Sequence, residues 1–174
     1  MHSVFSKDFD SIIAATQRLK AFDGSSVLIT GACGFIGSYL VDLLAYCNDN
    51  LFQRPCTIIG IDNHIVGNHT RLKHLTDKPH VRLLTWDISE RFTTYRGIIT
   101  PPTEWAIHCA SIASPVAYRQ RPMETMDVNS LGTRNALKWA DRYKVKGILH
   151  ISSSEVYGNP DVVPTPESYV GRVA

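Results

Sequence analysis

Three glycines separate an apolar run from a helical pattern in the segment VLITGACGFIGSYL. Gly31 would permit a tight turn, Gly34 would let the backbone come close to a pyrophosphate, and Gly37 would let the following helix pack against the strand. The first helical residues, Phe35 and Ile36, would add N–H donors at the positive end of the helix dipole. The spacing is GxxGxxG rather than GxGxxG, and an ordinary strand–turn–helix connection is the alternative. The stretch predicts a turn that binds a dinucleotide.

Short apolar runs alternate with helical patterns along the rest of the chain. The apolar runs cover residues 27–29, 57–61, 81–85, 105–109 and 147–152, and the helical patterns cover residues 3–21, 35–47 and 122–143. This alternation is typical of a parallel sheet with helices on both faces. The sequence therefore predicts an α/β fold, a doubly wound parallel sheet of the Rossmann type.

Three segments are expected within this fold. An amphipathic helix lies within residues 1–24 and ends at Asp23-Gly24, and a dinucleotide-binding domain covers residues 25–158. Residues 159–174 contain three prolines and predict an irregular loop on the substrate side. A loop that runs into a short helix is expected over residues 64–74.

Composition narrows the possible functions. A chain of 174 residues with 44% hydrophobic and 20% charged residues fits one globular domain. The net charge is +2 without a basic run, which gives no reason to expect a nucleic-acid or membrane partner. No apolar stretch reaches the roughly 18 residues that span a bilayer, and the N-terminus lacks the core of a signal peptide. These features predict a cytoplasmic protein.

The cysteines and histidines predict no metal site. The cysteines form no CxxC pair and lie in apolar segments, so free buried thiols are expected; they are Cys33, Cys47, Cys56 and Cys109. His64, His69 and His74 are spaced five residues apart, so they do not share a helix face, and no further ligand completes a set.

An acid follows the second apolar run. Asp62, with Asn63 after it, ends the run in TIIGIDN, where a carboxylate accepts hydrogen bonds from the adenosine ribose and repels a 2′-phosphate. The stretch NDNLFQRP lengthens the connection from the glycine motif. The first arginine or lysine after Asp62 is Arg71, so NAD is favoured over NADP as the cofactor. A simple strand-end cap is the alternative role for Asp62.

Two later strand ends add candidates for the same site. Asp87 in LLTWDIS would accept from the adenine amino group, with Ile88 against the ring; a turn-forming aspartate is the alternative. The small residues Cys109, Ala110 and Ser111 in HCASIAS would let a nicotinamide ribose come close to the backbone.

Three serines and a glutamate follow the fifth apolar run, in HISSSEVYG. Ser153, Ser154 and Glu155 would lie outside the carboxyl end of the strand, where ligands bind in such sheets. Serine is also common at helix N-caps and strand-end turns, which is the alternative interpretation.

The order of these motifs resembles the extended short-chain dehydrogenase/reductase family, the NAD-dependent epimerases and dehydratases. TGxxGFIG, Asp62-Asn63, HCAS, Asn129 in DVNSLGT and SSSEVYG match it over about residues 25–160. The segments ASPVAYRQRPMETMDVNSLGT and SSSEVYGNPDVVPTPESY are most similar to the UDP-glucuronate decarboxylase branch.

The resemblance implies an NAD-dependent reaction on a nucleotide sugar, with a UDP-sugar as the expected substrate. Hydride would leave the sugar C4, the carboxylate β to the new ketone would be lost, and the hydride would return. Ser153 matches the family's catalytic serine or threonine, and Glu155 matches a glutamate of the decarboxylase and dehydratase branches. Ser154 stands where the dehydratases carry an acidic aspartate, which favours decarboxylation.

Further residues take their expected roles from the same resemblance. Ser114 and Tyr118 would line the sugar or diphosphate site, and Asn129 would shape the active site. Residues 123–143 are candidates for a homodimer interface.

The general base of the family is a tyrosine with a lysine four residues later, and none of the seven tyrosines here has that lysine. In the decarboxylase branch the pair follows a stretch like PESYVGRVA. The sequence is therefore expected to stop short of the pair and of the substrate domain, so that this chain binds NAD without turnover. A 4-epimerase or 4,6-dehydratase remains the alternative within the family, and a non-catalytic NAD sensor is the alternative outside enzymes.

Overall fold

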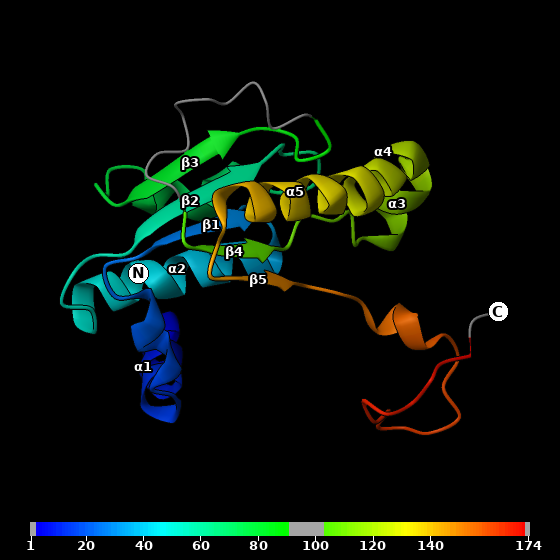
Figure 1. Ribbon diagram of the computed structural model, residues 1–174, viewed down its shortest axis with the longest axis horizontal. Coiled ribbons are helices and arrows are strands. Elements are labelled where there is room, and N and C mark those ends of the chain that lie inside the picture. Colours follow the sequence, from blue (N-terminus) through cyan, green and yellow to red (C-terminus); the bar gives the residue numbers. More distant parts are fainter. Residues whose placement is uncertain (1–2, 91–102, 173–174) are drawn as a thin grey trace.

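Five parallel strands form one sheet in a computed structural model that describes residues 3–90 and 103–172. The strands are β1 (Ser26–Thr30), β2 (Thr57–Asp62), β3 (Val81–Thr85), β4 (Trp105–His108) and β5 (Gly147–His150). Their order across the sheet is β3-β2-β1-β4-β5 (Figure 1). The order reverses between β1 and β4, which creates the switch point at which open α/β sheets bind ligands. The predicted doubly wound Rossmann sheet is confirmed.

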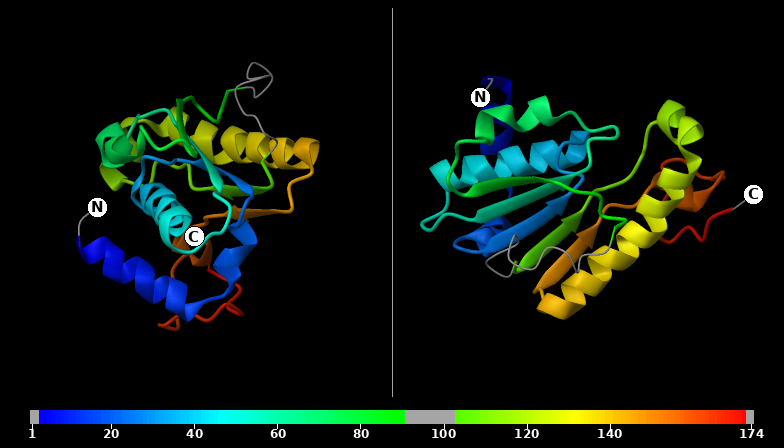
Figure 2. Two further views of the ribbon diagram at one scale, coloured as in Figure 1. Left: turned by 90° about the vertical axis from the view of Figure 1, so that its left-hand side faces the viewer. Right: turned by 90° about the horizontal axis from the view of Figure 1, so that it is seen from above.

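Helices cover both faces of the sheet. The α-helices are α1 (Ser3–Ala15), α2 (Phe35–Asn50), α3 (Pro115–Gln120), α4 (Pro122–Asp127) and α5 (Thr133–Tyr143). Tighter turns form η1 (Arg18–Phe22), η2 (His69–Leu75) and η5 (Ser154–Tyr157), and η4 (Val128–Gly132) is a π-helical turn. Figure 2 shows α2 on one side of the strands and α5 on the other.

The central strand β1 is buried at every position. Val27 and Ile29 of β1 pack with α2, whereas Leu28 packs with α5 on the opposite face. Successive side chains of a strand point to opposite faces, so a strand between two helical layers needs apolar residues at every position. The outer strand β5 is less enclosed, and its Leu149 is 55% exposed.

Two helical predictions need correction, and one helix was missed. The helix expected over residues 3–21 ends at Ala15, because the Thr16 hydroxyl accepts the N–H of Arg18 at 3.1 Å and starts a separate turn. The helix expected over residues 122–143 contains the π-helical turn η4. The helix α3 was not predicted at all, since six residues are too few to show a helical period.

The first helix packs on the outer side of α2. Phe9 is fully buried, with its ring centroid 5.1 Å from that of Tyr39 and 5.4 Å from that of Tyr46. The two tyrosine hydroxyls donate to Asp8 and Asp10 at 3.0 and 2.8 Å. This aromatic contact attaches α1 to the helix that follows the glycine turn. No helix among the described residues is long and apolar enough to cross a membrane.

Replacing Phe9 tests this attachment. Phe9→Ala is expected to lower the free energy of unfolding by about 3 kcal/mol, because it empties a buried aromatic site. Phe5→Ala is the matched control, since Phe5 is 42% exposed, and a loss below about 1 kcal/mol is expected. Urea unfolding followed by circular dichroism measures both; equal losses for the two variants would contradict the packing.

Candidate functional site

A hollow of about 930 Å³ opens at the carboxyl ends of the strands. Every strand contributes a residue at or just after its end: Thr30, Asp62, Trp86, Cys109 and Ile151. The hollow therefore lies across the switch point between β1 and β4, the expected place for a ligand in this fold.

The glycine turn forms one wall of the hollow. Gly31 has φ +67, and a Cβ there would lie 2.8 Å from backbone atoms of Ala110. A Cβ on Gly37 would overlap the Gly31 carbonyl, so α2 begins directly against the turn. Gly34 precedes α2 without a side-chain cap. The glycines thus leave the backbone accessible at the N-terminus of a 16-residue helix, which fits a diphosphate.

Most of the predicted cofactor residues meet at this hollow. Those that line it are Gly31, Gly34, Phe35, Ile36, Gly37, Asp62, Asn63, Ile88, Cys109, Ala110, Ser111 and Asn129. The predicted substrate residues Ser114 and Tyr118 line it as well. Asp87 and Ser154 are not among the described residues that line it.

Asp62 joins the second strand to the glycine turn. One carboxylate oxygen accepts the N–H of Cys33 at 2.9 Å, and the other accepts the N–H of His64 at 2.8 Å. A carboxylate has about four acceptor positions, so these two N–H groups leave acceptor capacity unused. The strand-end cap is therefore present, and the ribose contact stays a prediction compatible with it.

Burial raises the pKa of the Cys33 thiol to about 11, and the Asp62 carboxylate adds to the rise. The Cys33 side chain therefore stays a neutral thiol. All four cysteines are free, and Cys33, Cys47 and Cys56 are buried as expected, whereas Cys109 is only half-buried.

Asp87 forms a turn. It accepts the N–H and the hydroxyl of Ser89 at 2.8 and 2.6 Å and the Asn63 amide at 2.7 Å. Burial acts to raise the pKa of its carboxyl, but these hydrogen bonds outweigh burial and hold the pKa below its ordinary value. Asp87 thus ties the ends of β2 and β3 together, the alternative that the sequence left open; the adenine contact stays untested.

A buried histidine lies beneath the hollow. His108 is 2% exposed, and its ring nitrogens lie 2.7 Å from the Thr30 hydroxyl and 3.2 Å from the Thr133 hydroxyl. His150 stacks on it, with ring centroids 5.2 Å apart. Burial, with a smaller contribution from the charge of His150, lowers the pKa of His108 to about 4. His108 is therefore a neutral link between β1, β4 and α5.

The π-helical turn carries Asn129 to the hollow. The Ser111 hydroxyl donates to the Asn129 side-chain oxygen at 2.9 Å, which joins η4 to the end of β4. A π turn inserts a residue into a helix and re-aims its side chains, and such turns are frequent at functional sites.

Both interpretations of the serine motif are compatible with the structure. Ser153 is the N-cap of η5, and its hydroxyl accepts the N–H of Glu155 at 3.2 Å. Ser152, Ser153 and Glu155 also line the hollow. The catalytic roles of Ser153, Ser154 and Glu155 stay predictions.

Sequence reasoning missed Asn135 on α5. Its side-chain amide donates to three successive backbone carbonyls, those of Ile88, Ser89 and Glu90, at 2.9, 3.0 and 3.0 Å. The contact holds the loop that presents Ile88 to the hollow. Other lining residues that sequence reasoning did not assign to the site include Thr30, Arg71, Thr133 and His150. Thr133 is the last residue of DVNSLGT and Asn135 follows two positions later, so polar residues at the start of this helix were the available signal.

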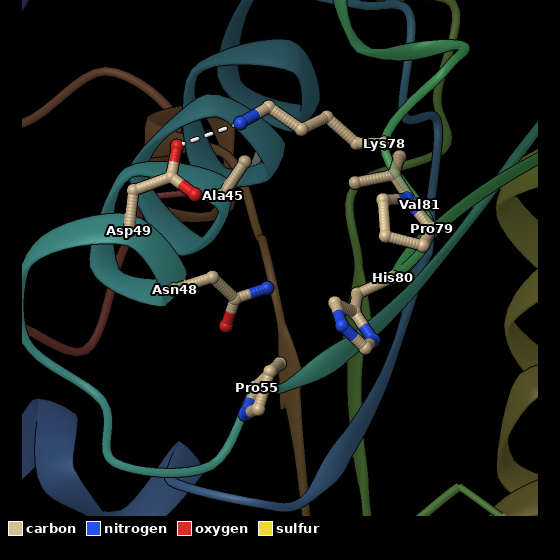
Figure 3. Close-up of a pocket in the computed structure, with 8 residues that line it drawn as sticks. All are labelled: Ala45, Asn48, Asp49, Pro55, Lys78, Pro79, His80 and Val81. Carbon is tan, nitrogen blue, oxygen red and sulfur yellow. Dashed lines mark hydrogen bonds and ion pairs between the residues drawn. The ribbon is translucent and has the colours of Figure 1, made fainter.

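A second hollow of about 290 Å³ lies near the end of α2 and the start of β3 (Figure 3). Lys78 and Asp49 pair across it at 2.8 Å. The amide of Asn48 is already engaged with the backbone of Cys56 at 2.9 and 2.7 Å. The predicted site residues do not line this hollow.

Among the described residues, no group of three acidic, histidine or cysteine side chains is arranged to hold a metal ion.

The fold and the larger hollow define a Rossmann dinucleotide-binding domain. Residues 27–172 match the model of the NAD dependent epimerase/dehydratase family, and the chain belongs to this family. UDP-glucuronic acid decarboxylase 5 of Arabidopsis thaliana is 37% identical over 147 residues, which cover 84% of this chain and 39% of that protein.

Two solved structures show the same fold. A UDP-glucose 4-epimerase from Thermotoga maritima with UDP-glucose has a TM-score of 0.68 at 26% identity, over 84% of this chain and 44% of that one. A dTDP-glucose 4,6-dehydratase from Streptomyces venezuelae with NAD bound has a TM-score of 0.65 at 27% identity, over 78% and 42%. The chain thus spans less than half the length of these relatives.

The low pKa of His108 predicts a pH-dependent stability. The unfolded histidine binds a proton near its ordinary pKa of 6.5 and the folded one only near 4, so stability is full above pH 6.5 and is lost as the pH falls toward 4. A loss of about 2 kcal/mol is expected between pH 7 and pH 5. His108→Gln should flatten this slope in denaturant titrations; an unchanged slope would show that other groups cause it.

The Asn135 contact predicts a stability loss on removal of the amide. Asn135→Ala is expected to lower the free energy of unfolding by about 1–3 kcal/mol, because three carbonyls lose their donor. Lys138→Ala, at an exposed position of the same helix, should change it by less than about 0.5 kcal/mol. Thermal unfolding compares the two variants, and a neutral Asn135→Ala would contradict the contact.

Proposed function

We propose that this chain binds NAD and that the protein containing it decarboxylates UDP-glucuronate. The observation that supports the proposal most is the single hollow at the switch point. It brings the glycine turn and Asp62 of one half together with Ser153 and Glu155 of the other. The similarity to the Arabidopsis decarboxylase supports the choice of reaction.

The glycine turn would hold the diphosphate, Asp62 the adenosine ribose, and the small residues after β4 the nicotinamide ribose. When bound there, NAD supplies reversible hydride transfer. Ile88, Ile112 and Val128 form an apolar cluster that reaches the hollow, and their side chains would exclude water from the bound cofactor.

The serine motif would act on the sugar. The Ser153 hydroxyl would hydrogen-bond the C4 oxygen and help to move its proton, and Glu155 would face the sugar ring from the same segment. A serine at position 154 is not an acid near neutral pH, so it cannot replace the aspartate that dehydration would use. The motif therefore favours decarboxylation over loss of water.

Self-association is a further part of the proposal. Residues 123–143 would form a homodimer interface, and the exposed apolar side chains there support it: Met123, Met126, Leu131 and Leu137.

Product analysis tests the reaction. The longest polypeptide that contains this sequence is incubated with UDP-glucuronate and NAD⁺, and CO₂ and the sugar nucleotides are measured. Release of CO₂ with UDP-xylose and without accumulating NADH is the expected result. Inversion at C4 with the carboxylate retained would instead identify an epimerase. The 174 residues contain no Tyr-x-x-x-Lys pair, so by themselves they should bind NAD⁺ in calorimetry without turnover.

The Ser153 hydroxyl is tested in the same assay. Ser153→Ala is expected to lower kcat at least about 100-fold, because the C4 oxygen loses its proton-transfer partner. Ser11→Ala is the matched control, because Ser11 is exposed on α1 and does not line the hollow, and its kcat is expected to stay within about 3-fold of the parent. The NAD⁺ affinity should be unchanged in both; similar effects of the two variants on kcat would contradict the role of Ser153.

A further inference from the structure

The charges around the larger hollow are unbalanced. Among the described residues that line it, Asp62, Glu124 and Glu155 carry carboxylates, and Arg71 alone carries a lysine or arginine charge. A diphosphate would bring two more negative charges into this surrounding. The glycine turn itself, from Thr30 to Ser38, contains no cationic side chain.

Arg71 is held beside the glycine turn. It lies in η2, and the N–H of Asn68 just before η2 donates to the Cys33 carbonyl at 3.3 Å. The following residue, Leu72, is fully buried against the α2 side of the core. The backbone of η2 is thereby fastened on both sides of Arg71, while the Arg71 side chain is exposed and borders the hollow.

The charge of Arg71 reaches the turn. The guanidinium opposes the rise that burial and Asp62 impose on the pKa of the Cys33 thiol, and Cys33 lies between Gly31 and Gly34. The nearby carboxylates contact histidines instead: Asp42 contacts His74, and Asp62 contacts His64. Within residues 3–90 and 103–172, no ion pair engages Arg71.

We propose that Arg71 is a cofactor-binding residue, whose guanidinium pairs with the diphosphate of the bound dinucleotide. The proposal rests on NAD binding as proposed above. A planar guanidinium is suited to two phosphate oxygens at once. The diphosphate is favoured over a 2′-phosphate because the buried Asp62 carboxylate stands at the ribose end and repels a phosphate there. Arg71 thus supplies the positive charge that the glycine turn lacks.

Calorimetric titration of the 174-residue chain with NAD⁺, NADP⁺ and adenosine tests the assignment. Arg71→Ala is expected to raise the Kd for NAD⁺ about 10-fold at low salt, and by less at about 0.5 M salt because ions screen the pair. Adenosine, which has no phosphate, should bind equally to both proteins. Arg71→Lys should recover part of the affinity. Lys73→Ala is the matched control, because Lys73 lies in η2 but does not line the hollow.

Each other outcome overturns the assignment in a distinct way. An Arg71→Ala effect on NADP⁺ alone would place the guanidinium at a 2′-phosphate instead. Equal Kd values for NAD⁺ in the parent and in Arg71→Ala would remove Arg71 from the site while leaving NAD binding intact. An equal loss of NAD⁺ affinity in Lys73→Ala would show that the effect comes from the net charge of the chain and not from a specific contact of Arg71. Absence of NAD⁺ binding by the parent chain would refute the proposed function and, with it, this one.

Discussion

The contact between Gly31 and Gly37 is the constraint on which the candidate site depends. No side chain separates the end of β1 from the first turn of α2, so the helix begins directly against the strand end. Its N–H groups and its positive dipole end therefore face the switch point of the sheet. A side chain at either glycine would push the helix away or meet the backbone after β4, and the wall that fits a diphosphate would be lost.

Polar side chains then hold the strand ends in place around that wall. Asp62 bonds the glycine turn, His108 links β1 and β4 to α5, and Asn135 bonds the loop after β3. At a switch point the loops that follow two neighbouring strands run in opposite directions. The backbone groups at these strand ends therefore lack partners from the hydrogen-bond ladder of the sheet. Paired side chains that bridge the gap satisfy buried groups and select one arrangement of the loops.

The local patterns predicted the fold well, and the failures have physical causes. Apolar periodicity predicted the five strands, the helix after the glycine turn and the short helix after β2. This periodicity reflects whether a strand or helix buries one face or two. The break after Ala15 depends on a single hydroxyl, and α3 is too short to show a period. The π turn at 128–132 changes the backbone by one residue within an otherwise regular pattern, and periodicity does not resolve that.

By itself the sequence determined the class of fold, the glycine turn, and the positions of Asp62 and the serine motif, because spacing along a strand–turn–helix unit is a local property. Only the tertiary structure decided which polar residues share the hollow. It paired Asp87 with the Asn63 amide at the end of the neighbouring strand, brought Arg71 to the rim, and joined Asn135 to a loop 45 residues earlier in the chain. Such contacts depend on how separate elements pack, and the spacing of residues within one element carries no record of that.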